Sequence, residues 1–231
     1  MRNTSSNPDV WPEGLLTRPA REPTAPGIVI LHGLGASMED LAGMADFVDP
    51  DGRFRWFFPN APMRPVRLHA GGMMRAWYDI HGLDAQSSED AEGLRDMAAR
   101  LTVLLDHAAD RGAPLILGGF SQGGAMSLYS ALHAGYPVAA VLALSTYLPL
   151  RTQVPGATTA KSPPIFWAHG QRDTVLPPQY MDVAEQILTP LGYSVARHRY
   201  AMAHTLCEEE LLDVRVFLRT ITDLREAEPT R

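Results

Sequence analysis

The sequence has one cysteine in 231 residues, Cys207, so it cannot form an internal disulfide bond. This cysteine usage fits a reducing compartment and predicts a cytoplasmic protein. The first residues contain no apolar segment of the kind that a secretory signal needs, and no apolar run approaches the ~18 residues that cross a bilayer. Lysine and arginine form no cluster, and the net charge is −6, so a nucleic-acid partner is not expected.

The remaining composition is that of one globular domain. A chain of 231 residues with 45% hydrophobic content suits a single α/β domain with a continuous core. No repeat or linker divides it. We expect the domain to span 13–224, after a flexible arm at 1–12 that is rich in Ser, Asn and Pro, and before a short tail at 225–231.

Short apolar runs alternate with helical patterns along the chain. Six runs are typical of strands covered on both faces: 27–31, 54–58, 115–117, 138–144, 165–168 and 193–200. Helical patterns follow Ser88, which we expect to be an N-cap, and recur at 181–191 and 206–224. This alternation predicts parallel βαβ units, hence a mostly parallel sheet flanked by helices. The stretch 59–87 fits neither period, and a loop of that length is usually functional.

The motif Gly119-Phe120-Ser121-Gln122-Gly123 lies between a predicted strand and the predicted helix 125–133. This setting is typical of a nucleophile elbow, in which a tight turn exposes a serine hydroxyl and flanking glycines leave room for the backbone. A glycine-rich phosphate loop is the alternative, but the motif lacks the Lys-Ser/Thr ending of a P-loop. Ser121 is therefore the predicted nucleophile.

The segment His32-Gly33-Leu34-Gly35 directly follows the first predicted parallel strand. Hydrolases place there a loop that gives one backbone N–H to an oxyanion, and the residue after the nucleophile gives the other. We expect the N–H groups of Leu34 and Gln122 to form this oxyanion hole. His32 is expected to hold the loop by hydrogen bonds rather than to act as a base.

The acid and the base should follow Ser121 in chain order. Asp173 lies on the loop after the strand 165–168, although a turn or helix-cap aspartate is an alternative there. His204 lies on the loop after the last strand and is the predicted base. Of the other histidines, His69 and His81 lie in the long loop and could contact substrate. Cys207 is expected to be a buried structural thiol rather than a second nucleophile.

Several motifs together resemble a known family. They are LHGLG at 31–35, GGMMRAWYD at 71–79, GFSQGGAMSLY at 119–129, LALSTYLP at 142–149, HGQRD at 169–173 and H-x-x-C-x-E from His204 to Glu209. In this order they look like the carboxylesterase/acyl-protein thioesterase family, closest to its bacterial carboxylesterase branch. The resemblance implies an α/β-hydrolase fold without a large lid domain. It also implies that Trp77, Tyr147 and Leu176 line an acyl groove.

These observations predict a serine carboxylesterase for short-to-medium acyl esters or thioesters, acting through Ser121, His204, Asp173 and an acyl-enzyme. No metal or organic cofactor is expected. An acyl-protein thioesterase or lysophospholipase on the same site is the main alternative, and a perhydrolase or peptidase is a further one. A non-catalytic binding module is disfavoured, because such a chain should have lost a triad residue. The expected partner is a small ester or thioester, and relatives that dimerise allow for a homodimer.

Overall fold

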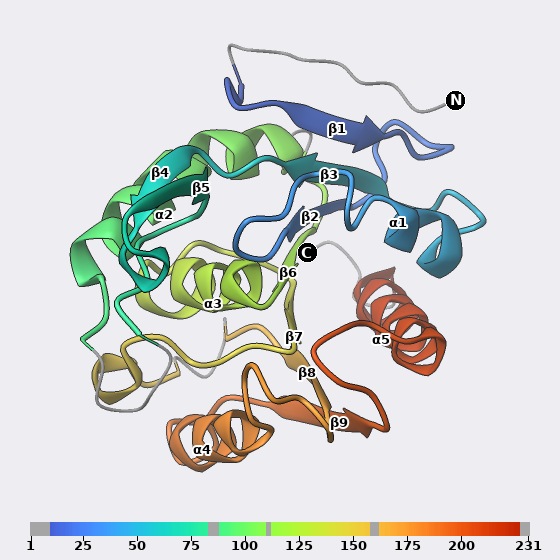
Figure 1. The fold of residues 1–231 in the computed structure, drawn as a ribbon. Helices are drawn as coiled ribbons and strands as arrows, with labels where there is room; N and C mark the ends of the chain where they lie inside the picture. The colour runs from blue at the N-terminus through green and yellow to red at the C-terminus, as the bar shows by residue number, and fades with distance from the viewer. Residues whose placement is uncertain (1–9, 83–87, 110–111, 158–161, 227–231) are drawn as a thin grey trace.

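The computed structural model describes residues 10–82, 88–109, 112–157 and 162–226, and its centre is a seven-stranded sheet (Figure 1). The strand order is β1-β3-β2-β6-β7-β8-β9. The strands are β1 (Leu15–Arg18), β2 (Gly27–Leu31), β3 (Arg55–Pro59), β6 (Leu115–Phe120), β7 (Ala140–Leu144), β8 (Ile165–Gly170) and β9 (Val195–Tyr200). Only the β1–β3 pair within this described sheet is antiparallel. The prediction of a mostly parallel sheet is confirmed.

Helices cover both faces of this sheet (Figure 1). They are α1 (Gly43–Val48), α2 (Ala91–Ala108), α3 (Gln122–Leu128), α4 (Gln179–Leu188) and α5 (Glu208–Glu226). In β2, Val29 and Leu31 pack into the cluster that contains α2, α3 and α4, whereas Ile28 and Ile30 pack into the cluster with α1 and α5. Because successive strand residues face opposite sides and both sides are buried, the strands appear in the sequence as continuous apolar runs.

The stretch 59–87 contains secondary structure that the sequence did not predict. A two-stranded hairpin of β4 (Met63–Val66) and β5 (Gly72–Arg75) encloses the short 3-10 helix η1 (Arg67–His69). Met63 and Met73 of the hairpin are exposed, so no apolar alternation marked its strands. The last part of the predicted loop, 83–87, lies outside the described residues.

The predicted flexible arm needs one correction. Residues 1–9 lie outside the described part of the chain, as do 227–231 of the predicted tail. Trp11, however, is only 1% exposed, and its indole N–H donates to the Asn60 carbonyl at 2.6 Å. The chain therefore joins the core before residue 13, because burial of a tryptophan with a satisfied N–H is strongly favourable.

Two helix boundaries also differ from the predictions. The N-cap of α2 is Asp90, whose side chain accepts from the Gly93 N–H at 3.0 Å, while the Ser88 hydroxyl pairs with His81 instead. Beyond α3 the chain continues in a π-helical turn, η3 (Tyr129–His133), and a 3-10 turn, η4 (Arg151–Gln153), follows β7. Across the described ranges, none of the helices combines the length and apolarity needed to span a membrane.

Glu210, in the first turn of α5, is a fully buried carboxyl group. Its exposed fraction is 0%, and neither carboxylate oxygen has a hydrogen-bond partner in the described part of the chain. Burial raises the pKa of Glu210 to about 8, and the nearby backbone N–H of Cys207 opposes this rise only in part. The carboxyl is therefore mainly protonated in the folded protein at neutral pH, although it ionises in the unfolded chain.

This difference predicts a pH-dependent loss of stability. Ionisation of Glu210 stabilises the unfolded chain from about pH 4.5 upward, whereas the folded chain keeps the proton up to about pH 8. Glu210 thus lowers the free energy of unfolding progressively as the pH rises from about 4.5 to about 8, and this destabilisation reaches its full size above about pH 8. Glu210→Gln cannot ionise, so the fall in unfolding free energy between about pH 5 and pH 8 should shrink by about 1 kcal/mol or more.

Urea unfolding at the two pH values measures this effect. Glu209→Gln is the matched control, because Glu209 is the preceding residue and is exposed. An identical pH dependence in the Glu210→Gln variant and the wild type would contradict the assignment of a protonated Glu210.

Candidate active site

Ser121 occupies the tight turn between β6 and α3, with φ 54° and ψ −119°. This left-handed backbone is rare for a residue with a side chain and is usually found at functional sites. The flanking glycines explain why the turn closes. A Cβ at Gly123 would lie 2.1 Å from the Leu31 carbonyl oxygen, and one at Gly119 would lie 2.4 Å from the carbonyl carbon of Gly123. The predicted elbow geometry is thus present.

The structure brings Ser121, His204 and Asp173 into one hydrogen-bonded line. Nε2 of His204 lies 3.0 Å from Oγ of Ser121, and its Nδ1 lies 2.7 Å from Oδ2 of Asp173. Asp173 follows β8 and His204 follows β9, so the carboxyl ends of adjacent parallel strands place them beside the elbow. In this arrangement Nε2 can take the serine proton while Nδ1–H donates to the carboxylate.

Asp173 uses its two carboxylate oxygens for different tasks. Oδ1 accepts from the backbone N–H groups of Val175 at 2.9 Å and Leu176 at 2.8 Å, and Oδ2 faces His204. The Asp173 side chain is fully buried. The alternative prediction of a turn aspartate is therefore also correct, since one oxygen fixes the turn and leaves the other for the imidazole.

A cavity of about 630 Å³ opens at this line, within the range of small-molecule sites. Ser121 and His204 line it together with the two predicted oxyanion residues, Leu34 and Gln122. The wall also includes Tyr147 and Leu176, as the resemblance implied, and His69 from the long loop. Further lining residues that the sequence did not indicate are Leu68, Ile80, Phe120, Val175 and Leu206. Leu68 comes from the unpredicted hairpin segment, which explains why it was missed.

Trp77 does not line this cavity. Its side chain is 0% exposed, and its indole N–H donates to the His32 carbonyl at 2.8 Å, with the ring 5.2 Å from the His32 ring. The resemblance placed Trp77 in the acyl groove by position, but the indole is directed into the core because its N–H needs a buried acceptor. Through this hydrogen bond and ring contact, Trp77 stabilises the segment that follows β2.

His32 and the Gln122 side chain hold the walls of the site. Nε2 of His32 accepts the Ala61 N–H at 2.9 Å, so Nδ1 carries the hydrogen and faces the Gly33 carbonyl at 2.7 Å. Burial lowers the pKa of His32 and keeps the ring neutral. The side-chain amide of Gln122 accepts from the backbone N–H of Trp77 at 3.0 Å and donates to the backbone carbonyl of Tyr78 at 2.7 Å. His32 is thus structural, as predicted.

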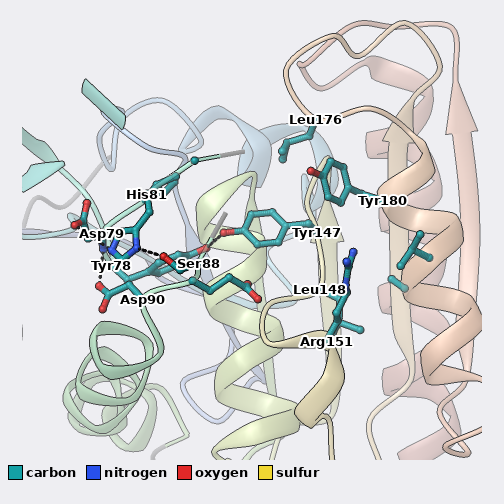
Figure 2. Close-up of a pocket in the computed structure, with 15 residues that line it drawn as sticks. Tyr78, Asp79, His81, Ser88, Asp90, Tyr147, Leu148, Arg151, Leu176 and Tyr180 are labelled. Atoms are coloured by element: carbon teal, nitrogen blue, oxygen red, sulfur yellow. Dashed lines mark hydrogen bonds and ion pairs between the residues drawn. The ribbon is translucent and has the colours of Figure 1, made fainter. Parts of the chain in front are cut away.

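A second, smaller cavity of about 90 Å³ adjoins the first. Ile80, Tyr147 and Leu176 line both cavities and form the partition between them. Figure 2 shows the Tyr78 and Tyr147 rings pointing toward each other, with hydroxyl oxygens 2.6 Å apart. Burial raises the pKa of both hydroxyls, so both stay protonated at neutral pH.

The far side of the partition carries both polar and apolar side chains. Its polar lining residues are His81, Ser88, Glu89, Asp90 and Arg151, and its apolar ones include Leu148, Val183 and Ala184. Figure 2 shows several of them, among them His81, Ser88 and Arg151. The Glu89 carboxylate accepts the Leu150 N–H at 3.0 Å, and burial raises the pKa of Glu89. His81 contacts Arg67 and Ser88 and lies away from Ser121, on the far side of the partition. In the described part of the chain, no group of three or more His, Cys, Asp or Glu side chains is arranged to hold a metal ion.

A mostly parallel sheet with this strained serine turn and hydrogen-bonded line defines a serine hydrolase of the α/β-hydrolase fold. The sequence matches the model of the phospholipase/carboxylesterase family over residues 14–222. It is 36% identical to acyl-protein thioesterase 1 of Mycosarcoma maydis, over 87% of this chain and 92% of that protein. Acyl-protein thioesterase 1 of Neurospora crassa is 33% identical over 83% of this chain and 84% of its own length.

Solved structures agree with this assignment. Acyl-protein thioesterase 2 of Zea mays has a TM-score of 0.82 at 26% identity and covers 90% of this chain and 98% of its own. Esterase PE8 has a TM-score of 0.73 at 28% identity over 89% of this chain and 97% of its own. The chain belongs to the phospholipase/carboxylesterase family, and it is a serine hydrolase that acts on carboxylic esters or thioesters.

Proposed function

We propose that Ser121 is the nucleophile, His204 the general base and Asp173 the residue that orients His204. The observation that supports this proposal is the unbroken hydrogen-bonded line from Ser121 Oγ to Asp173 Oδ2 at the mouth of the cavity. Nε2 of His204 removes the serine proton as Oγ attacks the acyl carbonyl, and Asp173 stabilises the resulting imidazolium. The protonated His204 then gives its proton to the leaving alcohol or thiol, which leaves an acyl-enzyme on Ser121.

Water completes the cycle by the same path. His204 removes a proton from water as the water oxygen attacks the acyl carbonyl carbon. The bond between this carbon and Ser121 Oγ then breaks, and His204 returns the proton to Oγ. In both steps the backbone N–H groups of Leu34 and Gln122 bind the negative oxygen of the tetrahedral intermediate. Because α3 begins at Gln122, its N-terminus adds a favourable electrostatic field.

A fluorophosphonate probe tests the assignment of the nucleophile directly. The probe forms a covalent bond to an activated serine, so peptide mass spectrometry of the labelled wild-type protein should find the adduct on Ser121. Heat-denatured protein, in which the line is broken, is the control and should not be labelled. An adduct on another residue would overturn the proposal.

The substrates we propose are short-to-medium acyl esters or acyl thioesters, hydrolysed by a cytoplasmic enzyme. Acylated proteins are a second candidate, because the curated relatives at 36% and 33% identity are acyl-protein thioesterases. Matched ester, thioester, lysophospholipid and amide substrates separate these activities by product analysis. Sedimentation analysis tests whether the chain forms a homodimer.

The partition between the two cavities limits the acyl chain in this proposal. Apolar residues such as Leu34 and Ile80 favour methylene groups near Ser121. A chain that passed Tyr147 would enter a cavity of only about 90 Å³, in which Glu89 and Arg151 lie among apolar residues. Contact between the acyl chain and these two polar side chains costs free energy, because the side chains would lose hydration without gaining a hydrogen-bond partner. We therefore expect preference to rise with chain length until the partition is reached, and then to fall.

An acyl series from acetate to palmitate measures this limit. In the wild type, kcat/KM should rise by up to about four-fold per methylene, the value for complete burial of each, and then decline. Tyr147→Ala opens the partition and should move the maximum to longer chains. Tyr147→Phe keeps the ring and should keep the wild-type maximum. If all three proteins prefer the same length, Tyr147 does not set the limit.

A further inference from the structure

His169, the fifth residue of β8, is buried directly against Asp173. Its side chain is 0% exposed. Nε2 lies 2.8 Å from the Leu176 carbonyl oxygen and 3.4 Å from Oδ2 of Asp173. The imidazole therefore contacts both ends of the turn that carries the aspartate.

The hydrogen on this ring can be assigned from its partners. A carbonyl oxygen only accepts, so Nε2 of His169 carries the hydrogen and donates it to Leu176. Nδ1 has no hydrogen-bond partner among the described residues, which fits the bare nitrogen of a neutral ring. The charged or titratable groups around the ring are Asp173, His204 and Arg199. Burial is the largest cause of the lowered pKa of His169; His204 and Arg199 lower this pKa further, and the Leu176 carbonyl and Asp173 oppose the shift only in part. His169 is thus a neutral donor.

The contacts of Asp173 show what this donor adds. Oδ1 already accepts two backbone N–H groups, from Val175 and Leu176. Oδ2 lies between two imidazoles, with His204 Nδ1 at 2.7 Å and His169 Nε2 at 3.4 Å. The longer separation is an electrostatic contact of the N–H dipole rather than a full hydrogen bond. In a buried site such a dipole still acts on the carboxylate charge.

We infer that His169 is a positioning residue for the reaction: its neutral Nε2–H fixes the 173–176 turn through the Leu176 carbonyl and holds Oδ2 of Asp173 on His204. This inference rests on the proposed roles of Ser121, His204 and Asp173. It has two consequences. The orientation of His204 depends on a residue that touches neither substrate nor serine, and the wall residue Leu176 is fixed by the same bond.

Two substitutions with side chains of similar length distinguish the effect of the His169 N–H donor from the effect of its packing. His169→Gln can place its amide N–H near the position of Nε2, whereas His169→Met has the same length and no donor. The Gln variant should keep kcat within about five-fold of wild type, and the Met variant should lose about ten- to a hundred-fold in kcat. KM for a short acyl ester should change less than kcat in both variants.

The pH profile of kcat/KM distinguishes positioning from packing. Loss of a neutral donor leaves more of the Asp173 charge acting on the His204 imidazolium, so the acid limb of the Met variant should move to higher pH by about half a unit. The Gln variant should keep the wild-type limb. If the limb of the Met variant stays in place or moves to lower pH, or if the two variants behave alike, His169 only fills space and the inference is wrong.

A measurement on the wild-type protein is independent of how well the variants fold. Nitrogen-15 NMR of the histidine rings should find His169 neutral and protonated on Nε2 at neutral pH. A proton on Nδ1, or a charged ring at neutral pH, would overturn the inference. Fluorophosphonate titration counts active sites in each variant. Failure of wild-type Ser121 to react would instead overturn the proposed function, so the two failures are distinguishable.

Discussion

Replacement of Ser121 by alanine is expected to lower kcat/KM for an activated ester by about three or more powers of ten. The variant loses the oxygen that we propose forms the covalent bond to the acyl group, while the predicted oxyanion hole and the cavity remain. Residual hydrolysis should come from water that His204 activates in the same site. Circular dichroism and thermal unfolding should match the wild type, because the Ser121 hydroxyl contacts His204 and is not part of the core.

A neighbouring buried serine provides the matched control. Ser127 lies in the same helix, α3, and its hydroxyl donates to the Gly123 carbonyl at 2.8 Å. Ser127→Ala should cost about 1 kcal/mol of stability and leave turnover close to wild type. Full activity in a correctly folded Ser121→Ala protein would refute the assignment of the nucleophile.

Substitution of His204 by alanine is expected to remove both most of the rate and the acid limb of the pH profile. In the wild type, kcat/KM should fall at acidic pH, because an imidazolium cannot accept the serine proton. Asp173→Asn should lower kcat by about four powers of ten, since an amide at this position favours the wrong tautomer of His204. Stopped assays across the pH range measure both effects.

His69→Ala is the control for these two variants. His69 lines the same cavity but has no place in the hydrogen-bonded line, so its loss should change KM more than kcat. His81→Ala should have less effect still, because His81 lies beyond the partition. If the His204→Ala protein kept the wild-type pH profile, or if the His69→Ala protein lost it, another histidine would be the base.

The sequence predicted the fold and the three side chains that the structure brings into one hydrogen-bonded line, because both follow from short-range patterns. Each central strand is a continuous apolar run, since both of its faces are buried. Chain order and position after a strand were enough to select Asp173 and His204, because the carboxyl ends of parallel strands share one edge of the sheet. The bonding distances among the three side chains could not be known from the sequence.

The direction of a side chain was less predictable than its position in the chain. The segment that carries Trp77 does pass near the site, but the indole is directed into the core toward the His32 carbonyl. Similarly, Ser88 and Asp90 are both good N-cap residues, and only the contact of Ser88 with His81 leaves Asp90 to begin α2. Such choices depend on partners that are distant in sequence, which no local pattern contains.

The exposed hairpin of β4 and β5 was missed for a related reason. Val66 is the one fully buried residue of the hairpin's two described strands, so too few apolar residues alternate with polar ones to mark a strand in the sequence. Met63 and Met73 are more than half exposed at 54% and 61%. The same segment brings Leu68 and His69 to the cavity, and the substrate-binding wall was therefore the least predictable part of the site.

The two hydrogen bonds of the Gln122 amide bear on how this site could change in evolution. Any residue at 122 has a backbone N–H and could serve the oxyanion, so catalysis alone would leave the side chain free to vary. The amide, however, binds the backbone of both Trp77 and Tyr78, and only a side chain that both accepts and donates can do so. Selection on residue 122 therefore acts through the architecture of a segment more than forty positions earlier in the chain. Because both partners are backbone groups, this constraint falls on the side chain at 122 and on the path of the segment, and not on the side chains at 77 and 78.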